Sequence, residues 1–412
     1  MECGLVRLVI LAAAFVFILL FGCLGQQAPA AQGNVQAPLP APAVAPEKNV
    51  TPPPVQIAPP QAPQNVTNAT DAAGGNATTL NKTIEAQMPR GTKDANLEVE
   101  VYDKDRAFPG TTLFAEYHDA QHPRIVEVNM LGEVVWQYAL PDNLKQYTNP
   151  GLHVSRLPNN HILFVLPMKG VYEIDRNGTV VWSYLDAKVS HDAQRLANGN
   201  TLVAWGGADT KADAQVKEIS PAGKIVWSWH AKDYFDKAPY SSISRENSWT
   251  HTNAATRLQN GNTLISLRNF QLTIEVAPSG AVVWSYDWTT FGSAPDPHDP
   301  ELLPNDDLLA CLPPPDAPYQ AVEINRSSGK TAWTYYKPGL MSSRDCDRLP
   351  NGNTLIETVD TNVTGGAKGW ESRILEVTQS GEIVWQLSVV NAAPGKNPGW
   401  LYKAERIALP SD

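Results

Sequence analysis

Three features are scarce in this chain of 412 residues: cysteine, basic clusters and long hydrophobic runs. The formal net charge is -10 at pH 7, and lysine and arginine are concentrated nowhere along the chain. Because nucleic acids bind to basic surfaces, this composition argues against a nucleic-acid partner. An anionic small molecule would need a locally positive site.

The one long hydrophobic run extends from Leu8 to Phe21, directly after Arg7, and is too short to span a bilayer comfortably. Its place at the N-terminus predicts an export signal over residues 1–23. Because the run ends in the sequence LFGC, we favour a lipoprotein signal in which Cys23 is lipidated. An ordinary signal peptide and an uncleaved anchor are the alternatives. A lipidated protein would be held at the extracellular face of the cell membrane.

Cysteine is rare, with four in the whole chain. Cys3 lies within the signal and Cys23 is the lipidation candidate, which leaves Cys311 and Cys346. In an oxidising compartment this pair is a disulfide candidate, and two buried free thiols are the alternative.

Large apolar residues are scarce between residues 24 and 96, where Pro, Ala, Gln, Asn and Thr prevail. Such a segment cannot offset the entropy of ordering, so we expect a disordered, extended stalk. N-glycosylation sequons, which also arise by chance in such sequence, begin at Asn49, Asn65, Asn68, Asn76, Asn81, Asn177, Asn325 and Asn362. Together with the lipidation signal they suggest an archaeal surface glycoprotein.

Tryptophan, by contrast, is abundant, and six copies end a repeated phrase. In each copy a glutamate comes first, a glycine follows five or six residues later, and the tryptophan follows four residues after the glycine. The glutamates are Glu127, Glu173, Glu218, Glu275, Glu323 and Glu376. The tryptophans, between 45 and 57 residues apart, are Trp136, Trp182, Trp227, Trp284, Trp333 and Trp385. A period of this length indicates a repeat architecture.

Residues 344–388 show the unit most clearly: RDCDRL, an Asn-Gly turn, TLIET, a loop, and RILEVTQSGEIVWQL. Four short antiparallel strands per period describe a propeller blade. The C-terminal segment YKAERIALPSD has the pattern of a first strand, and the first repeat lacks such a strand. We therefore predict an all-β, six-bladed β-propeller over residues 97–412, closed by the C-terminal strand.

The innermost strands of such a ring converge on its axis, so the residues that begin them meet at the mouth of the central channel. Five repeats carry histidine or arginine near this position: His153, His191, His251, His298 and Arg344. Three of these are followed by an aspartate: Asp192, Asp299 and Asp345. A single histidine there would most often be structural. Several histidines converging with an arginine favour a functional cluster.

The loops between the second and third strands open on the same face as these residues. One of them, SLRNFQ, carries Arg268. The loops of this face are also rich in aromatic residues, some of which would only pack on one another. The rest would suit an aromatic ligand. We predict that the substrate contacts Arg344, His153, Trp249 and Trp288.

Three segments carry a resemblance to a known family: HDAQRLANGNTL at 191, WTHTNAATRLQNGNTLISLRNFQ at 249 and PHDPELLPNDDLL at 297. From about residue 111 to 410 the chain resembles the bacterial arylsulfate sulfotransferases, whose catalytic domain is a six-bladed propeller with a histidine-lined centre. The resemblance implies that His298 is the nucleophile that takes the sulfuryl group. It also implies that His191, His251 and Arg268 hold the sulfuryl oxygens. Bacterial members carry an additional β-rich N-terminal domain where this chain has the stalk.

The implied activity moves a sulfuryl group from an aryl sulfate to a phenol through a sulfohistidine. Fixed guanidinium and imidazole donors stabilise the sulfuryl charge, and Asp299 or another carboxylate would orient its histidine. This chemistry requires neither a metal nor another cofactor. The alternatives are a non-catalytic ligand- or glycan-binding propeller of the cell envelope, a quinoprotein-like oxidoreductase, and a metal site built from the histidines and a carboxylate.

Overall fold

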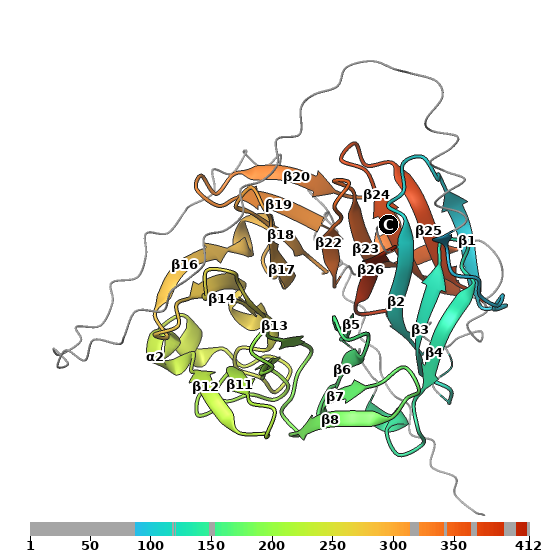
Figure 1. Cartoon of the computed structure of the whole chain (residues 1–412). Helices are drawn as coiled ribbons and strands as arrows, with labels where there is room; N and C mark the ends of the chain where they lie inside the picture. The colour runs from blue at the N-terminus through green and yellow to red at the C-terminus, as the bar shows by residue number, and fades with distance from the viewer. Residues whose placement is uncertain are drawn as a thin grey trace, which may run out of the picture. The chain divides into compact units, whose positions relative to one another are not determined.

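The computed structural model of the chain describes residues 87–117, 119, 121–147, 153–313, 321–341, 344–363, 369–390 and 401–409. The predicted signal segment, Cys23 and the stalk before residue 87 lie outside the described residues. The described strands form six antiparallel sheets that make a six-bladed β-propeller, as predicted (Figure 1). No helix within these ranges is long and apolar enough to cross a membrane.

Blades 2 to 5 are four-stranded meanders that run from the axis outwards (Figure 1). Blade 2 comprises β5 (Val154–Arg156), β6 (Ile162–Leu166), β7 (Gly170–Ile174) and β8 (Val180–Leu185). Blade 3 comprises β9 (Ala193–Arg195), β10 (Thr201–Ala204), β11 (Val216–Ile219) and β12 (Ile225–Trp229). Blade 4 comprises β13 (Thr252–Arg257), β14 (Thr263–Leu267), β15 (Leu272–Val276) and β16 (Val282–Asp287). Blade 5 comprises β17 (His298–Leu302), β18 (Asp307–Cys311), β19 (Ala321–Asn325) and β20 (Thr331–Tyr335).

Blade 1 joins the two ends of the propeller. It comprises β26 (Ala404–Ala408), β2 (Gly110–Glu116), β3 (Arg124–Asn129) and β4 (Val134–Ala139). The C-terminal β26 pairs antiparallel with β2, with Gly110 opposite Ala408 and Phe114 opposite Ala404. The predicted closure by the C-terminal strand is therefore confirmed.

Blade 6 carries two strands that the sequence pattern did not predict. Its meander is β22 (Cys346–Arg348), β23 (Thr354–Val363), β24 (Gly369–Val377) and β25 (Ile383–Val389). The N-terminal β1 (Leu97–Tyr102) pairs with the outer strand β25, and the short β21 (Leu340–Met341) pairs with β23. The exposed edge of blade 6 is thereby covered.

Short helical turns interrupt the loops between the strands. They are η1 (Lys145–Tyr147), α2 (Lys232–Phe235), η2 (Tyr240–Ser242), η3 (Arg268–Phe270) and η4 (Trp288–Phe291). The glycines of the repeated phrase close the outer hairpins, and all six adopt φ between 67° and 90°. This left-handed conformation favours glycine over residues with a side chain.

The repeated glutamate and tryptophan bind one arginine contributed by the next blade. In blade 2, Glu173 Oε2 lies 2.6 Å from Arg195 Nη2, and the Arg195 guanidinium lies 4.7 Å from the Trp182 ring centroid. The indole N–H of Trp182 also donates to the backbone oxygen of Pro221, in blade 3, at 3.0 Å. The phrase therefore couples neighbouring blades through an ion pair, a cation–π contact and a hydrogen bond.

We call this arrangement the interblade clamp. Its six arginines, in the order of the tryptophans from Trp136 to Trp385, are Arg176, Arg195, Arg257, Arg326, Arg348 and Arg406. Each pairs with the glutamate of the same repeat as its tryptophan. The clamp of Arg406 closes the ring from blade 6 to blade 1 and is fully buried. Apolar side chains pack between blades, as where Leu113 of blade 1 and Phe164 of blade 2 share a cluster.

Candidate active site

The inner-strand residues predicted from the sequence lie at the axial ends of five different blades. His298 is the first residue of β17, and His251 directly precedes β13. His153, His191 and Arg344 lie one or two residues before β5, β9 and β22. These strands surround the axis (Figure 1), so the fold converts residues distant in sequence into neighbours.

Tyr402 lies at the centre of this group. The His191 ring stacks on the Tyr402 ring with centroids 5.2 Å apart and planes 20° apart, and the His298 ring lies 6.0 Å from it. The Arg344 guanidinium lies 5.6 Å from the Tyr402 centroid. His251 adjoins His191, with ring centroids 5.2 Å apart. The structure thus brings the predicted histidines and Arg344 together around one aromatic ring.

His298 is held as a neutral imidazole. Its ring is buried, and Nδ1 lies 2.6 Å from the backbone oxygen of Asp296. Because a carbonyl oxygen only accepts, the proton is on Nδ1 and the lone pair is on Nε2. Burial, followed by the charges of Arg344 and Arg268, lowers the pKa of His298 well below its usual value. Nε2 makes no hydrogen bond to any described residue, so its lone pair is available as a nucleophile.

Arg268, the first residue of η3, fixes the tautomer of His251. Its Nη1 lies 3.1 Å from His251 Nε2. Because a guanidinium only donates, Nε2 accepts and the His251 proton is on Nδ1. Burial, followed by the charge of Arg268, lowers the pKa of His251 to about 4. His251 is therefore neutral at neutral pH.

All five N–H groups of Arg268 have partners. Glu246 accepts from Nη1 and Nη2 at 2.6 and 2.8 Å, and Asp296 Oδ2 accepts from Nε and Nη2 at 3.3 Å each. His251 takes the remaining hydrogen. The Glu246 side chain is 52% exposed, whereas those of Asp296 and His251 are 7% and 12% exposed. An incoming anion would therefore reach Arg268 by replacing the Glu246 carboxylate.

The backbone around these side chains adopts conformations that are unfavourable for residues with a Cβ. His251, Asp296 and Asp299 have φ of 48°, 49° and 38°. Non-glycine residues with positive φ are concentrated at functional sites, where surrounding contacts enforce them. Asp209 provides such contacts, because its carboxylate accepts from the backbone N–H groups of Thr250 and His251 at 3.1 to 3.2 Å.

Lys403, which follows Tyr402, lies among carboxylates. Its Nζ is 2.6 Å from Asp299 and 3.6 Å from Asp345, and these two acids with Asp347 have oxygens within 4.8 Å of one another. Burial opposes the charge on Lys403, but the three carboxylates outweigh it and raise its pKa well above the usual value. Asp299 therefore pairs with this lysine. The prediction that Asp299 orients a histidine is not supported, because a backbone carbonyl fixes the tautomer of His298.

Trp249 and Trp288, predicted to contact substrate, do not join the cluster. Trp249 is 4% exposed, packs against Phe270, and donates from Nε1 to the backbone oxygen of Tyr240 at 2.9 Å. Trp288 is 0% exposed and donates to Thr273 Oγ1 at 3.0 Å. Both indoles belong to the core beneath the loops, because packing there removes more apolar surface from water than exposure at the mouth would.

Cys311 and Cys346 are buried free thiols that share one apolar cluster between blades 5 and 6. Cys311 is the cross-strand partner of His298. Burial, followed by the contact with Cys311, raises the pKa of Cys346 well above its usual value. The structure therefore describes the alternative of two buried thiols and not the predicted disulfide.

Several residues of the site were not identified from the sequence. Tyr402 and Lys403 precede the closing strand β26, and Tyr402 lies seven residues before Leu409, as His251 lies seven before Leu258. The C-terminal segment was predicted to be an inner strand, but the prediction of functional residues did not extend to the positions that precede it. That extension would have found both residues. Glu246 and Asp296 lie in loops with no repeated counterpart, so no periodic signal indicates them.

The fold and the site define a propeller whose axis presents a neutral imidazole, unprotonated at Nε2, beside two arginines. A family model described as Arylsulfotransferase (ASST) matches residues 98–337. The chain belongs to this family. The matched range contains His153, His191, His251, Arg268 and His298 and ends before Arg344 and Tyr402.

No curated protein matches the chain. Among solved structures, it is similar to a protein of unknown function from Bacteroides caccae, at 20% identity and a TM-score of 0.53, over 73% of this chain and 99% of that one. A catalytically inactive virginiamycin B lyase from Staphylococcus aureus matches at 11% identity and a TM-score of 0.41, over 71% and 99%. BamB from Moraxella catarrhalis matches at 12% identity and a TM-score of 0.35, over 72% and 98%. The likeness to the Bacteroides protein concerns the fold.

Proposed function

We propose that the propeller moves a sulfuryl group from an aryl sulfate to a phenol through a sulfohistidine at His298. The observation that carries the proposal is the fixed tautomer of His298: the hydrogen bond from Nδ1 to Asp296 places the lone pair of a neutral imidazole on Nε2. Family membership supports an aryl sulfotransferase in general.

In the first half-reaction, His298 Nε2 forms a bond to sulfur, and the bond from sulfur to the aryl oxygen breaks. In the second, the phenol oxygen forms a bond to sulfur, and the electron pair of the sulfur–nitrogen bond returns to Nε2. Two displacements replace one, and the imidazole is regenerated.

The charge on the sulfuryl oxygens would be stabilised by groups already fixed around the axis. Arg344 lies over Tyr402, beside His298, and Arg268 becomes available when the sulfuryl group replaces Glu246. His191 and His251 lie against one another next to them. Donors fixed before the reaction need no reorganisation in the transition state, which is their catalytic advantage.

The test is turnover by the purified chain with 4-nitrophenyl sulfate as donor and phenol as acceptor. We expect release of coloured 4-nitrophenolate, and a mass increase of one sulfuryl group when the donor is supplied alone. His298→Ala should abolish both. His122→Ala is the matched control, because His122 is an exposed histidine paired with Asp119. Turnover that is indifferent to His298→Ala would refute the mechanism, and ligand-dependent stabilisation without turnover would favour the non-catalytic binding propeller.

The proposal includes an exported protein attached to the extracellular face of the membrane by a lipid on Cys23. Its support is the sequence of the N-terminal segment, where a short apolar run ends in LFGC. Cys23→Ser should move the protein from the membrane fraction to the soluble fraction. Retention in the membrane fraction would favour an uncleaved anchor.

A further inference from the structure

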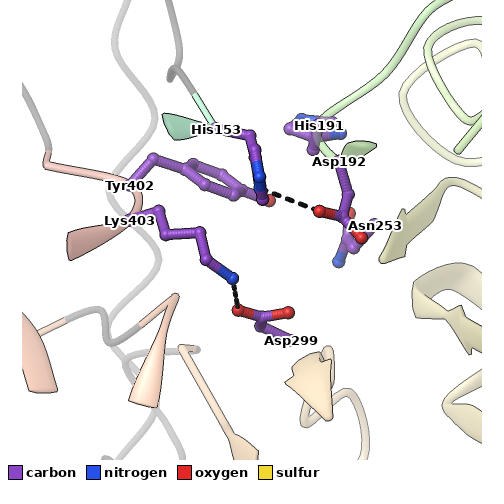
Figure 2. A pocket seen from close by; sticks show the side chains of 7 residues that line it. All are labelled: His153, His191, Asp192, Asn253, Asp299, Tyr402 and Lys403. Carbon is purple, nitrogen blue, oxygen red and sulfur yellow. Dashed lines mark hydrogen bonds and ion pairs between the residues drawn. The ribbon is translucent and has the colours of Figure 1, made fainter. Parts of the chain in front are cut away.

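A pocket beside Tyr402 is lined by polar side chains, and three of them have a buried atom without a partner. Its walls are His153, His191, Asp192, Asn253, Asp299, Tyr402 and Lys403. Figure 2 shows these seven side chains, with the Tyr402 ring pointing from the closing segment toward His153 and Asp192. The pocket therefore contains both His153 and Tyr402, and the Tyr402 ring lies beside the rings of His191 and His298.

Three buried atoms of this pocket make no hydrogen bond within the described part of the chain: His153 Nε2, Asn253 Oδ1 and Tyr402 Oη. A buried polar atom without a partner costs about 1–3 kcal/mol, so three around one pocket require an explanation. Tyr402 Oη carries a hydrogen, and Asn253 Oδ1 only accepts. A hydroxyl group that enters the pocket can accept from Tyr402 Oη and donate to one of the two acceptors.

Asp192 orients His153 so that its Nε2 is the nitrogen without a proton. His153 Nδ1 lies 2.8 Å from Asp192 Oδ1, as Figure 2 shows, and the other carboxylate oxygen accepts from the backbone N–H of Ala255 at 2.8 Å. The carboxylate is thus fixed on both sides, and the His153 proton is on Nδ1. A carboxylate behind an imidazole stabilises the imidazolium that forms when the other nitrogen takes a proton.

Other charged groups surround His153. Asp299, Asp347 and Glu405 lie close enough to His153 to interact with it electrostatically. Lys403 is the opposing cation, and its charge is already compensated by Asp299 at 2.6 Å.

The proposed reaction releases a proton that neither His298 nor His251 accepts. A phenol loses its O–H proton when its oxygen bonds to sulfur, and His298 keeps its own Nδ1 proton throughout. His251 Nε2 is occupied by Arg268. We propose a proton relay in which the acceptor phenol gives this proton to His153 Nε2 while Tyr402 Oη holds the phenol oxygen, with Asp192 as a positioning residue. The inference rests on the proposed function.

In the relay, the phenol oxygen accepts a hydrogen bond from Tyr402 Oη while the phenol O–H passes its proton to His153 Nε2, so that each unpartnered atom gains a partner. The oxygen–sulfur bond forms, the bond between sulfur and His298 Nε2 breaks, and the electron pair returns to that nitrogen. Burial raises the pKa of Tyr402 above its usual value, so Tyr402 stays protonated and donates to the phenol oxygen. When the next donor is cleaved, the proton on His153 returns to an aryl oxygen that needs it, or is lost to solvent where the aryl group leaves as a stable anion. His153 is then neutral again.

The experiment separates the two half-reactions in the full chain, using His153→Gln and Tyr402→Phe. With 4-nitrophenyl sulfate alone, we expect the burst of 4-nitrophenolate to be retained, because this phenolate leaves as a stable anion and needs no proton. Transfer to unsubstituted phenol should slow by roughly 10²- to 10⁴-fold, the usual contribution of general acid–base catalysis. An acceptor phenol that is already ionised at the assay pH should recover most of the lost rate.

His161→Gln is the matched control. His161 Nδ1 lies 2.7 Å from Glu173, so the variant loses a histidine–carboxylate pair far from the pocket. It should transfer to all acceptors at wild-type rates. If the pocket variants lose the same factor with ionised and neutral acceptors, or lose the burst as well, the relay is refuted. If the wild-type chain shows no burst and no transfer, the proposed function itself fails, which is a separate outcome.

Discussion

Glu246→Gln tests whether a carboxylate of the protein competes with the sulfuryl group for Arg268. Two Glu246 oxygens occupy Nη1 and Nη2 of the guanidinium, a geometry that two sulfuryl oxygens would share. Glutamine has the size of glutamate but no charge, and only one of its two terminal atoms accepts a hydrogen bond. The substitution therefore weakens the competitor and leaves Arg268 held by Asp296 and His251.

The size of the effect follows from the exposure of the pair. Ion pairs with one exposed partner contribute about 0.2–1 kcal/mol, and the bidentate geometry places this pair at the upper end. Removal of about 1 kcal/mol of competition corresponds to roughly fivefold tighter binding of the anion. We expect KM for the aryl sulfate to fall by about this factor while kcat changes little, because the contact is replaced before sulfur is attacked.

The assay is the initial rate with 4-nitrophenyl sulfate at saturating phenol, together with inhibition by inorganic sulfate, which should become stronger by a similar factor. Glu382→Gln is the control, because Glu382 forms an exposed pair with Arg106 at 2.7 Å, away from the axis. An unchanged or higher KM in Glu246→Gln, with Glu382→Gln behaving as wild type, would show that Glu246 does not compete with substrate.

Three further predictions concern stability, measured by urea unfolding. Burial lowers the pKa of His251 to about 4, so the unfolded state binds a proton at a higher pH than the folded state does. The wild-type chain should therefore lose about 3 kcal/mol of stability as the pH falls from 6.5 to 4. His251→Gln should lose correspondingly less over the same range. Burial raises the pKa of Glu357 well above 4.5, so the wild-type chain loses stability as the pH rises beyond 4.5, and the advantage of Glu357→Gln should grow over the same range. Arg406→Ala leaves Glu376 buried without its partner and should cost about 3–5 kcal/mol, more than Arg176→Ala, whose arginine is 26% exposed. Equal losses for the two arginine variants would contradict the buried closing clamp.

The sequence predicted the architecture because its information is periodic. Glutamate, glycine and tryptophan recur at fixed spacing, and each maps to one outer hairpin. The arginine of the clamp escaped the pattern because it comes from two places. Arg176 lies on the turn before β8, whereas Arg195 lies on β9, so no single offset from tryptophan finds both. The added strand β1 was missed for a related reason, since it pairs with residues almost 300 positions away and belongs to no repeat.

The site was predicted in part for the same reason. The inner-strand positions of His191, His251 and His298 repeat. The structure places the centroids of these rings 5.2 to 6.0 Å from that of Tyr402 or from one another. The burial of a loop side chain does not follow the repeat, so the sequence could not indicate it. Trp249 was therefore expected at the mouth of the channel, whereas it lies in the core. The protonation state of each ring depends on single contacts, such as His298 with a carbonyl, that no sequence spacing specifies.

The same C-terminal segment closes the ring and completes the site. Tyr402 and Lys403 lie directly before β26, and β26 completes blade 1 by pairing with β2. Removal of residues 401–412 would therefore take away the ring on which His191 stacks, the cation that pairs with Asp299, and the buried arginine of the closing clamp. A chain truncated there would keep every histidine of the site in its sequence. It would lack the residues that hold them around a common centre. Activity should therefore be lost even where the blades other than blade 1 remain folded.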